Sequence, residues 1–322
     1  MSVRIGVIGT GFGARVVAPV FDATPGCEVV EVVSARDDAG VASLCDRTDL
    51  DLVSVHSPPF LHAAHVRRAL GNGQSVLCDK PFGVAAQEAE TLLGAAEAAE
   101  CLHLLNFEFR YEPMRALLRS LIIDGVIGDV EHVTWTHFSS GSVTPLRPHG
   151  WLFDRASGGG WLGAWGSHAV DTIRWMLGEI VSAHGAPRTV VGQRPDTDGV
   201  LRTCDAEDAF SAWLTTESGT TVAIDSSFAA AVTMAPRIVV YGTDGVLECI
   251  GDARIVVRRS DKDDELHERP TGPGDAHLAP MQAWAEVVRD AVHEGMAPAG
   301  APTFADGLAC ARVLDALGRR CR

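Results

Sequence analysis

A glycine-rich turn near the start of the chain constrains the fold more than any other feature of the sequence. It follows a β-branched run over residues 3–8 and precedes a helical pattern over about 14–23. The turn matches G-x-G-x-x-G/A, in which glycines permit a tight turn and a close backbone approach to a pyrophosphate, and the small last residue, here Ala14, is expected to let helix and strand pack closely. The helix that follows supplies N–H groups and a positive dipole end. We therefore predict dinucleotide binding here, against the alternative of an ordinary turn between a strand and a helix. The residues of the motif are Gly9, Thr10, Gly11, Phe12, Gly13 and Ala14.

The first part of the chain alternates between strand and helix patterns. β-Branched runs recur at 28–34, 52–57 and 75–78, and helical patterns lie between them at about 60–71 and after them at 85–99. Such alternation predicts a parallel, doubly wound α/β sheet.

After about residue 120 the pattern changes. Strand-like runs follow one another without helices between them, which predicts a largely antiparallel sheet in a second domain of α+β type. Helical periodicity returns at the end of the chain, and the charged, Pro- and Gly-rich stretch 261–275 is predicted to be an exposed loop. The domain boundaries expected are 1–120 and 121–322. The predicted strands are 130–138, 209–215, 220–228, 237–241, 246–249 and 254–259, and the predicted final helices are 276–295 and 304–318.

The end of the second strand bears on which dinucleotide binds. NAD-binding units place an acidic residue there to bind the ribose, whereas this chain has Ser34, Ala35 and Arg36. A guanidinium binds a 2′-phosphate through its planar fork, and the missing acid removes a repulsion. We therefore predict NADP, with NAD remaining possible if Arg36 is a solvated residue and Asp37 binds the ribose.

A rare lysine stands at the end of a predicted parallel strand. Of 27 basic residues only Lys80 and Lys262 are lysines, and Lys80 lies between Asp79 and Pro81. Ligands in such sheets bind at the carboxyl ends of the strands. An amine can be tuned for proton transfer and a guanidinium cannot, so Lys80 is the first catalytic candidate, with a plain surface lysine as the alternative.

A second candidate follows a glycine-rich segment at 158–166. His168 lies in the first turn of a predicted amphipathic helix over 167–177, where it could exchange a proton with a substrate hydroxyl near neutral pH. A packed or capping histidine is the alternative. Asp171 is on the same helical face and is a substrate contact or an interdomain partner.

Several further residues are weaker candidates for substrate binding. They are polar or aromatic residues of loops that are expected to border the substrate cleft. The alternative is that they are structural loop residues without contact to a substrate. No acid or cysteine accompanies His56, His62 and His65, so no metal site is expected. The remaining substrate-binding candidates are Asn106, Arg110, His149, Trp151 and Trp161.

Composition excludes several classes of protein. The net charge is −15 without a basic stripe, which argues against nucleic-acid and anionic-membrane partners. No apolar run is long enough to span a bilayer, and a strand pattern beginning at residue 3 leaves no room for a signal peptide. The eight scattered cysteines indicate reduced thiols of a cytoplasmic protein.

Taken in order, these motifs resemble the glucose–fructose oxidoreductase / inositol dehydrogenase (Gfo/Idh/MocA) family over nearly the whole chain. The resemblance implies a Rossmann domain followed by a domain with an open sheet that is often used for homo-oligomers. It also implies NAD(P)-dependent oxidation or reduction of a small-molecule sugar, polyol or related carbonyl. By that match Lys80 and His168 take the catalytic positions, and Ser57, Pro58, His62 and Asp79 join the cofactor site. The matching segments are 9–14, 56–62, 79–81, 110–113, 125–128, 158–171 and 241–245.

Two departures from the family pattern stand out. The family commonly has Asp four residues before the histidine, and this chain has Ala164. Only 17 residues separate Ser34 from Leu52, which predicts no third strand, or only a stub near 41–44, and a more exposed adenine site. Alternative functions are an NADP-binding sensor without turnover, which Ala164 would suit, and imine reduction or another reductase chemistry.

Overall fold

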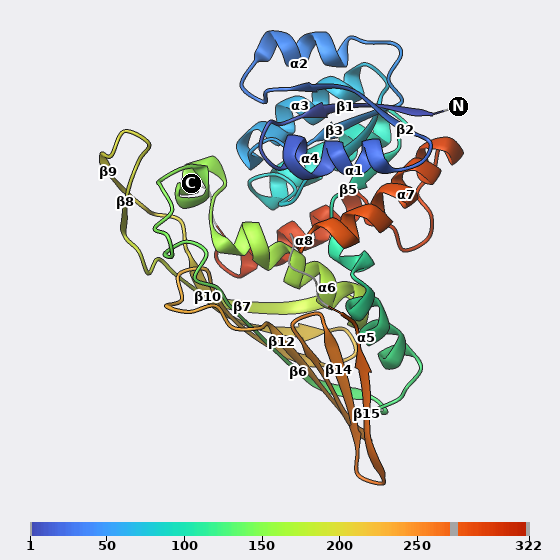
Figure 1. Cartoon of the computed structure of the whole chain (residues 1–322), viewed down its shortest axis with the longest axis vertical. Coiled ribbons are helices and arrows are strands. Elements are labelled where there is room, and N and C mark those ends of the chain that lie inside the picture. The colour runs from blue at the N-terminus through green and yellow to red at the C-terminus, as the bar shows by residue number, and fades with distance from the viewer. Residues whose placement is uncertain (1, 271–275, 320–322) are drawn as a thin grey trace.

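The structure is a computed structural model that describes residues 2–270 and 276–319. Its first part is a parallel five-stranded sheet in the order β2-β1-β3-β4-β5 with helices on both faces (Figure 1). This is the predicted doubly wound α/β fold. Its strands are β1 Val3–Ile8, β2 Cys27–Val33, β3 Leu52–Val55, β4 Ser75–Cys78 and β5 His103–Leu105. Its helices are α1 Ala18–Ala23, α2 Asp38–Cys45, α3 Pro59–Gly71 and α4 Ala86–Ala98.

Two helices from the end of the chain complete the core of this first part. α7 (Leu278–Glu294) joins α1 on one face of the sheet, where Trp284 is fully buried against strand residues such as Ile5. α8 (Phe304–Ala316) packs against α4 on the other face, which α2 and α3 also cover, and Phe304 contacts Phe82 there. The predicted helical periodicity at both segments is confirmed.

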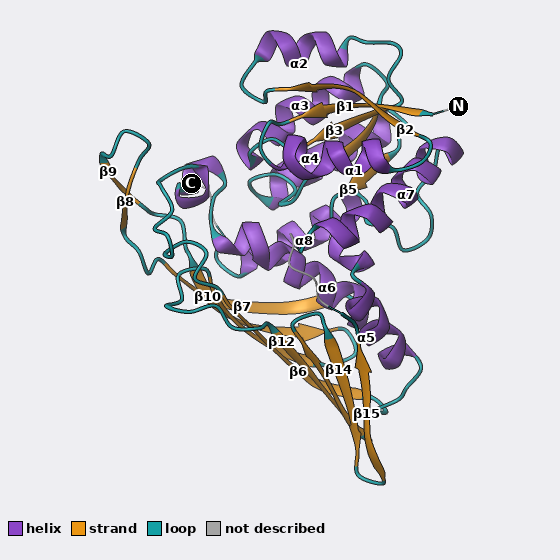
Figure 2. Ribbon diagram, viewed as in Figure 1, coloured by secondary structure: helices purple, strands orange, loops and turns teal. Residues whose placement is uncertain are grey.

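The second part is a mixed sheet of eight strands in the order β15-β14-β13-β12-β6-β11-β10-β7 (Figure 2). All neighbouring strands are antiparallel except β6 and β11. Helices α5 (Pro113–Ile123), α6 (Ser167–Leu177) and α8 lie on the side of this sheet that faces the first part (Figure 1). The strands are β6 Val130–Phe138, β7 Ile180–Arg188, β10 Ala209–Thr216, β11 Thr221–Ser227, β12 Arg237–Gly242, β13 Gly245–Ile250, β14 Arg254–Arg259 and β15 Lys262–Glu268.

Two details differ from the sequence-based expectations. The stretch 261–275 was expected to be a loop, but 262–268 forms the edge strand β15 because it folds back antiparallel on β14. Residues 271–275 lie outside the described part of the chain. Strand β7 and the small hairpin of β8 (Gln193–Pro195) and β9 (Leu201–Thr203) were not predicted, since their residues are mostly exposed and lack apolar alternation.

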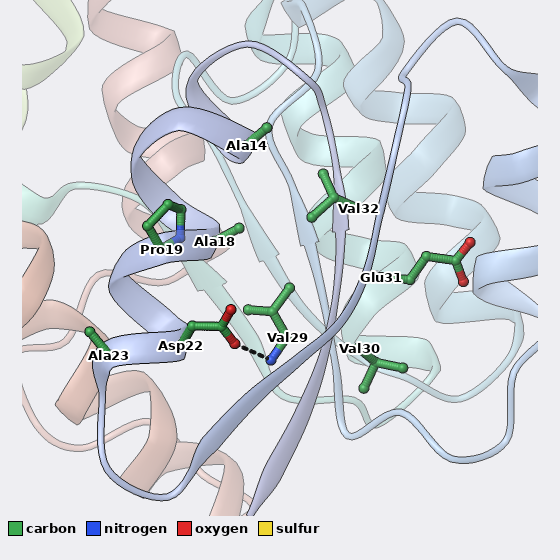
Figure 3. Close-up of a pocket in the computed structure, with 9 residues that line it drawn as sticks. All are labelled: Ala14, Ala18, Pro19, Asp22, Ala23, Val29, Val30, Glu31 and Val32. Carbon is green, nitrogen blue, oxygen red and sulfur yellow. Dashed lines mark hydrogen bonds between the residues drawn. The ribbon is translucent and has the colours of Figure 1, made fainter.

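The short connection after β2 has the predicted consequence. Between Ser34 and Leu52 the described chain forms only α2, so no strand pairs with the outer edge of β2. A surface groove of about 640 Å³ lies between this strand and α1 (Figure 3). Its walls are mostly apolar, and Asp22 closes one end by accepting a hydrogen bond from the Val29 backbone. The structure therefore leaves this edge of the sheet uncovered.

In the described residues no helix combines the length and apolar character needed to cross a membrane.

Candidate active site

The glycine-rich turn packs tightly on the end of β3. A Cβ at Gly9, where φ is +134°, would lie 2.4 Å from the carbonyl oxygen of His56, and one at Gly13 would lie 3.1 Å from the His56 Cβ. A Cβ at Gly11 would meet no described atom within 4 Å. Gly11 therefore presents open backbone, as close approach of a pyrophosphate requires.

One assignment within this motif needs correction. Ala14 was expected to be the small residue that lets helix and strand pack closely. The structure gives that role to Gly13, which is buried against His56 and Val7, while Ala14 lines the groove of Figure 3. The first helical turn after Phe12 is π-helical over Gly13–Val17. Because a π-helical turn contains more residues than an α-helical turn, it shifts which residue faces the strand.

A buried polar network joins the ends of three strands of the first sheet. His56 after β3 lies between the Ser54 hydroxyl, 2.7 Å from its Nε2, and the Asp79 carboxylate, 3.3 Å from its Nδ1. Asp79 also accepts hydrogen bonds from the Lys80 backbone and from the Asn106 amide. Burial alone would raise the pKa of Asp79, but the hydrogen bond and charge of His56 hold it below its usual value. The network fixes the backbone that presents Lys80.

The side chain of Lys80 reaches across to the second glycine-rich segment. Its Nζ donates a hydrogen bond of 2.7 Å to the carbonyl oxygen of Ala164. Ala164 lies in a second π-turn, over Leu162–Gly166, directly before α6. π-Turns are frequent at functional sites, and here one precedes each of the two helices that flank the site. The two strongest sequence motifs, 84 residues apart, therefore meet at one point.

His168 lies one turn further along, with its side chain 3% exposed. Burial lowers its pKa well below the usual value, and the nearby charge of Lys80 lowers it further. Neither ring nitrogen has a hydrogen-bond partner among the described residues. His168 is therefore a neutral imidazole with both ring nitrogens unused, which is the state from which a general base starts.

Two residues beside His168 were missed by the sequence analysis. Glu108, fully buried after β5, places its Oε1 3.9 Å from the His168 Nε2. The same oxygen accepts a hydrogen bond of 2.6 Å from Nδ1 of His277, the residue before α7. The only available signal was an acid inside the apolar run Phe107–Phe109, and nothing in the sequence related it to residues 168 or 277.

Arg110 and Asp171 form a buried ion pair with each other, so their polar atoms are not presented to a substrate. The guanidinium makes two hydrogen bonds to the Asp171 carboxylate, at 2.9 and 2.6 Å, and one of 2.8 Å to Asp306. Burial alone would lower the pKa of Arg110, but the two carboxylates raise it. The interdomain pairing considered for Asp171 fits this geometry better than a substrate contact, since α6, α8 and the segment after β5 are joined here.

Comparison with known proteins identifies the family of the chain. Residues 3–107 match the family model described as oxidoreductase family, NAD-binding Rossmann fold, and residues 116–248 match the GFO/IDH/MocA C-terminal domain. The chain belongs to the Gfo/Idh/MocA family. The expected family and the expected fold class are both confirmed.

Individual relatives are distant. An uncharacterised oxidoreductase of Synechocystis sp. is 28% identical over 64% of this chain and 60% of its own length. Levoglucosan dehydrogenase of Pseudarthrobacter phenanthrenivorans is 28% identical over 49% of this chain and 40% of its own length. The matches thus span less than two thirds of these relatives. A solved levoglucosan dehydrogenase in complex with NADH and levoglucosan superimposes with a TM-score of 0.89 at 21% identity, covering 100% of this chain and 97% of that one, which shows the shared fold.

The structure gives His62 of the family motif a structural position. It is fully buried, with Nε2 2.7 Å from the Ser57 carbonyl and Nδ1 3.2 Å from the Pro81 carbonyl. The Ser57 hydroxyl is hydrogen-bonded to Nδ1 of His65. Direct cofactor contact by the His62 side chain, as the resemblance implied, does not fit these bonds. His62 instead ties the loop that contains Pro58 to the loop that contains Lys80.

The remaining substrate candidates lie on the second part of the molecule. Trp161 stacks on Phe228 with ring centroids 4.3 Å apart and donates a hydrogen bond to Ser226, so it covers the end of the sheet. His149 is half-buried and Trp151 is 36% exposed, which leaves both side chains accessible. The sequence analysis did not include His137, which lies between Trp161 and Trp165 on the inner face of β6.

Protonation of buried histidines makes stability depend on pH. Burial lowers the pKa of His137 to about 4 and that of His65 to about 4. Below about pH 6.5 the unfolded chain binds these protons before the folded chain does, so folding stability falls as the pH falls from about 6.5 towards 4. The expected loss is up to about 1.4 kcal/mol per pH unit for each histidine. Denaturation at pH 7 and pH 5 should show a smaller loss for His137→Gln than for the parent, and an unchanged loss for the exposed control His293→Gln.

Proposed function

We propose that the protein is an NADP-preferring dehydrogenase or reductase that transfers a hydride between nicotinamide and a sugar, polyol or related alcohol or carbonyl. The observations that support this best are the meeting of Lys80 with the segment that precedes His168 and the open backbone at Gly11. Family membership and the levoglucosan dehydrogenase relative support the same class of substrate.

Bound nicotinamide would supply the carbon that accepts or donates the hydride. The described residues fit it: the Gly11 backbone is open, and the N–H groups of the turn and of the helix start can bind a pyrophosphate. Lys80 donates hydrogen bonds to the substrate oxygen and polarises it, since the Ala164 carbonyl occupies only one of its three ammonium protons. His168, neutral at the start, takes the hydroxyl proton during oxidation and returns it during reduction.

A substrate screen tests this proposal. Sugars, polyols and their carbonyl counterparts are mixed with the protein and NADP(H), and the nicotinamide absorbance is followed. We expect turnover with at least one compound and a slower rate for His168→Ala. Tight NADP binding without turnover across the whole screen would contradict the proposal.

We further propose that Arg36 selects NADP. It is exposed at the end of β2, and its backbone N–H is 3.3 Å from the Ser34 hydroxyl. Asp37, the competing ribose contact, is instead the N-cap of α2 and accepts a hydrogen bond from the Gly40 backbone. This use of its carboxylate supports a 2′-phosphate site at Arg36.

Arg36→Ala is expected to weaken NADP binding by roughly 1.5–3 kcal/mol, the worth of a hydrogen bond to a charged group, and to leave NAD binding nearly unchanged. Calorimetric titration with each cofactor measures both. The matched control is Asp38→Ala, which changes another exposed charged residue, two positions after Arg36. Tighter binding of NAD than of NADP by the parent protein would show that the selection is absent.

A binding protein without turnover is the second candidate, and Ala164 favours it. The family pattern has an acid at this position, whereas Ala164 has no polar side chain and offers only its carbonyl oxygen. In that case a small ligand should shift NADP affinity while no compound in the screen is turned over.

We also propose that the protein works in the cytoplasm as a homo-oligomer assembled through the second sheet. The face of this sheet turned away from the helices exposes Trp213 by 47% and Tyr241 by 40%, with His132 between their rings. Exposed aromatic groups of this kind are enriched at protein interfaces. Sedimentation of the parent and of Trp213→Ser tests this assembly: the variant should dissociate, and a parent that sediments as a monomer would contradict it.

A further inference from the structure

A buried carboxylate faces the proposed catalytic histidine from another part of the chain. Glu108 is fully buried, and its Oε1 lies 3.9 Å from the His168 Nε2. Nδ1 of His277 donates a hydrogen bond of 2.6 Å to the same oxygen. The ring of Phe109 contacts both imidazoles, with centroids 4.5 Å from His168 and 5.0 Å from His277. Three distant segments of the chain thus meet in one cluster around His168.

Several buried polar atoms of this cluster lack a hydrogen-bond partner. Oε2 of Glu108 and both ring nitrogens of His168 are buried without a hydrogen-bond partner among the described residues. Buried polar atoms without partners are rare, and they are costly unless they serve a site. The other charged or titratable groups that face His168 are Lys80 after β4, Arg115 on α5 and His277 before α7, and each of them disfavours a proton on His168. Glu108 is the acid among its neighbours.

We propose that Glu108 is the positioning residue of His168 and replaces the acid that the family pattern has at position 164. This inference rests on the proposed hydride transfer. Glu108 keeps the imidazole proton on Nε2 and leaves Nδ1 as the acceptor. In oxidation the substrate O–H proton goes to Nδ1, the C–H hydrogen leaves with its electron pair as hydride to nicotinamide, and the O–H electron pair completes the carbonyl. The carboxylate stabilises the imidazolium that results, and His277 anchors the carboxylate.

Kinetics of Glu108→Gln test the role of the carboxylate. The amide keeps the size of the side chain and loses its charge. We expect kcat to fall about 10²–10⁴-fold while KM changes little, because the group acts on the transition state. Glu108→Asp should recover part of kcat. The control is Glu112→Gln, another buried acid of the same segment, which pairs with Arg269 away from His168.

A second measurement does not need turnover. The ¹⁵N shifts of the His168 ring report which nitrogen is protonated. We expect the Nε2–H form in the parent and a mixture of both forms in Glu108→Gln and, to a smaller degree, in His277→Asn. The His277→Asn variant also keeps the test usable if Glu108→Gln does not fold.

The outcomes separate the two proposals. If the parent turns over a substrate but Glu108→Gln leaves both kcat and the ring shifts unchanged, the positioning role is overturned and the hydride-transfer function stands. If the ring shifts change as expected but the parent shows no turnover, the contact of Glu108 with His168 stands and the proposed function fails.

Discussion

Lys80→Arg is expected to bind NADP as the parent does and to lose about 10²–10³-fold in hydride-transfer rate, the usual effect of removing one well-placed hydrogen-bond donor to a reacting oxygen. Arginine keeps the positive charge, but its planar fork cannot reproduce the point contact that Lys80 makes with the Ala164 carbonyl, so its N–H groups would not reach the substrate oxygen from the same position. Cofactor titration and single-turnover kinetics measure the two effects separately.

The sequence offers a matched control for this variant. Lys262 is the other lysine of the chain and is exposed on the edge strand β15. Lys262→Arg should keep the parental rate. A near-parental rate for Lys80→Arg as well would mean that Lys80 has only a structural role.

Asp171→Asn is expected to lower the free energy of unfolding by about 3–5 kcal/mol, the usual cost of removing one partner of a buried ion pair. Arg110 would remain buried with Asp306 as its only charged partner among the described residues. Since folded proteins are stable by roughly 5–15 kcal/mol in total, this variant should unfold at a clearly lower denaturant concentration.

The control for Asp171→Asn is the exposed pair of Arg312 and Glu90, whose side chains are 60% and 55% exposed. Glu90→Gln should change stability by less than about 1 kcal/mol. Equal effects of the two substitutions would show that the Arg110 pair does not hold the two parts of the molecule together.

Much of the fold could be predicted from local patterns. The alternation of β-branched runs with helices gave the parallel sheet, and the 17 residues between Ser34 and Leu52 left room only for α2. The edge strand β15 was mistaken for a loop because Lys262–Glu268 is charged and almost wholly exposed. Its strand conformation depends on pairing with β14, which is a tertiary effect that apolar alternation does not record.

The sequence pointed to site residues where a residue stood out from its surroundings in the sequence. Lys80 stood out in a chain of arginines, and His168 stood out beside glycines. Glu108 and His277 could not be found in this way, because they are 169 residues apart and only the packing of α7 against the segment after β5 brings them together. Arg110 was chosen as a polar residue near the cleft and Asp171 as a residue on the same helical face as His168, and their buried ion pair shows that they neutralise each other.

Deuterium transfer from labelled NADPH tests the central claim most directly. NADPH carrying deuterium at nicotinamide C4, in either of its two stereochemical forms, is incubated with the protein and a mixture of keto-sugars, aldoses and lactones, and the products are analysed by mass spectrometry. The account predicts deuterium on a carbinol carbon of at least one product, from one of the two labelled forms only, and much less of it with Lys80→Arg and His168→Ala. Deuterium in no product, while NADPH binds tightly, would contradict hydride transfer at this site.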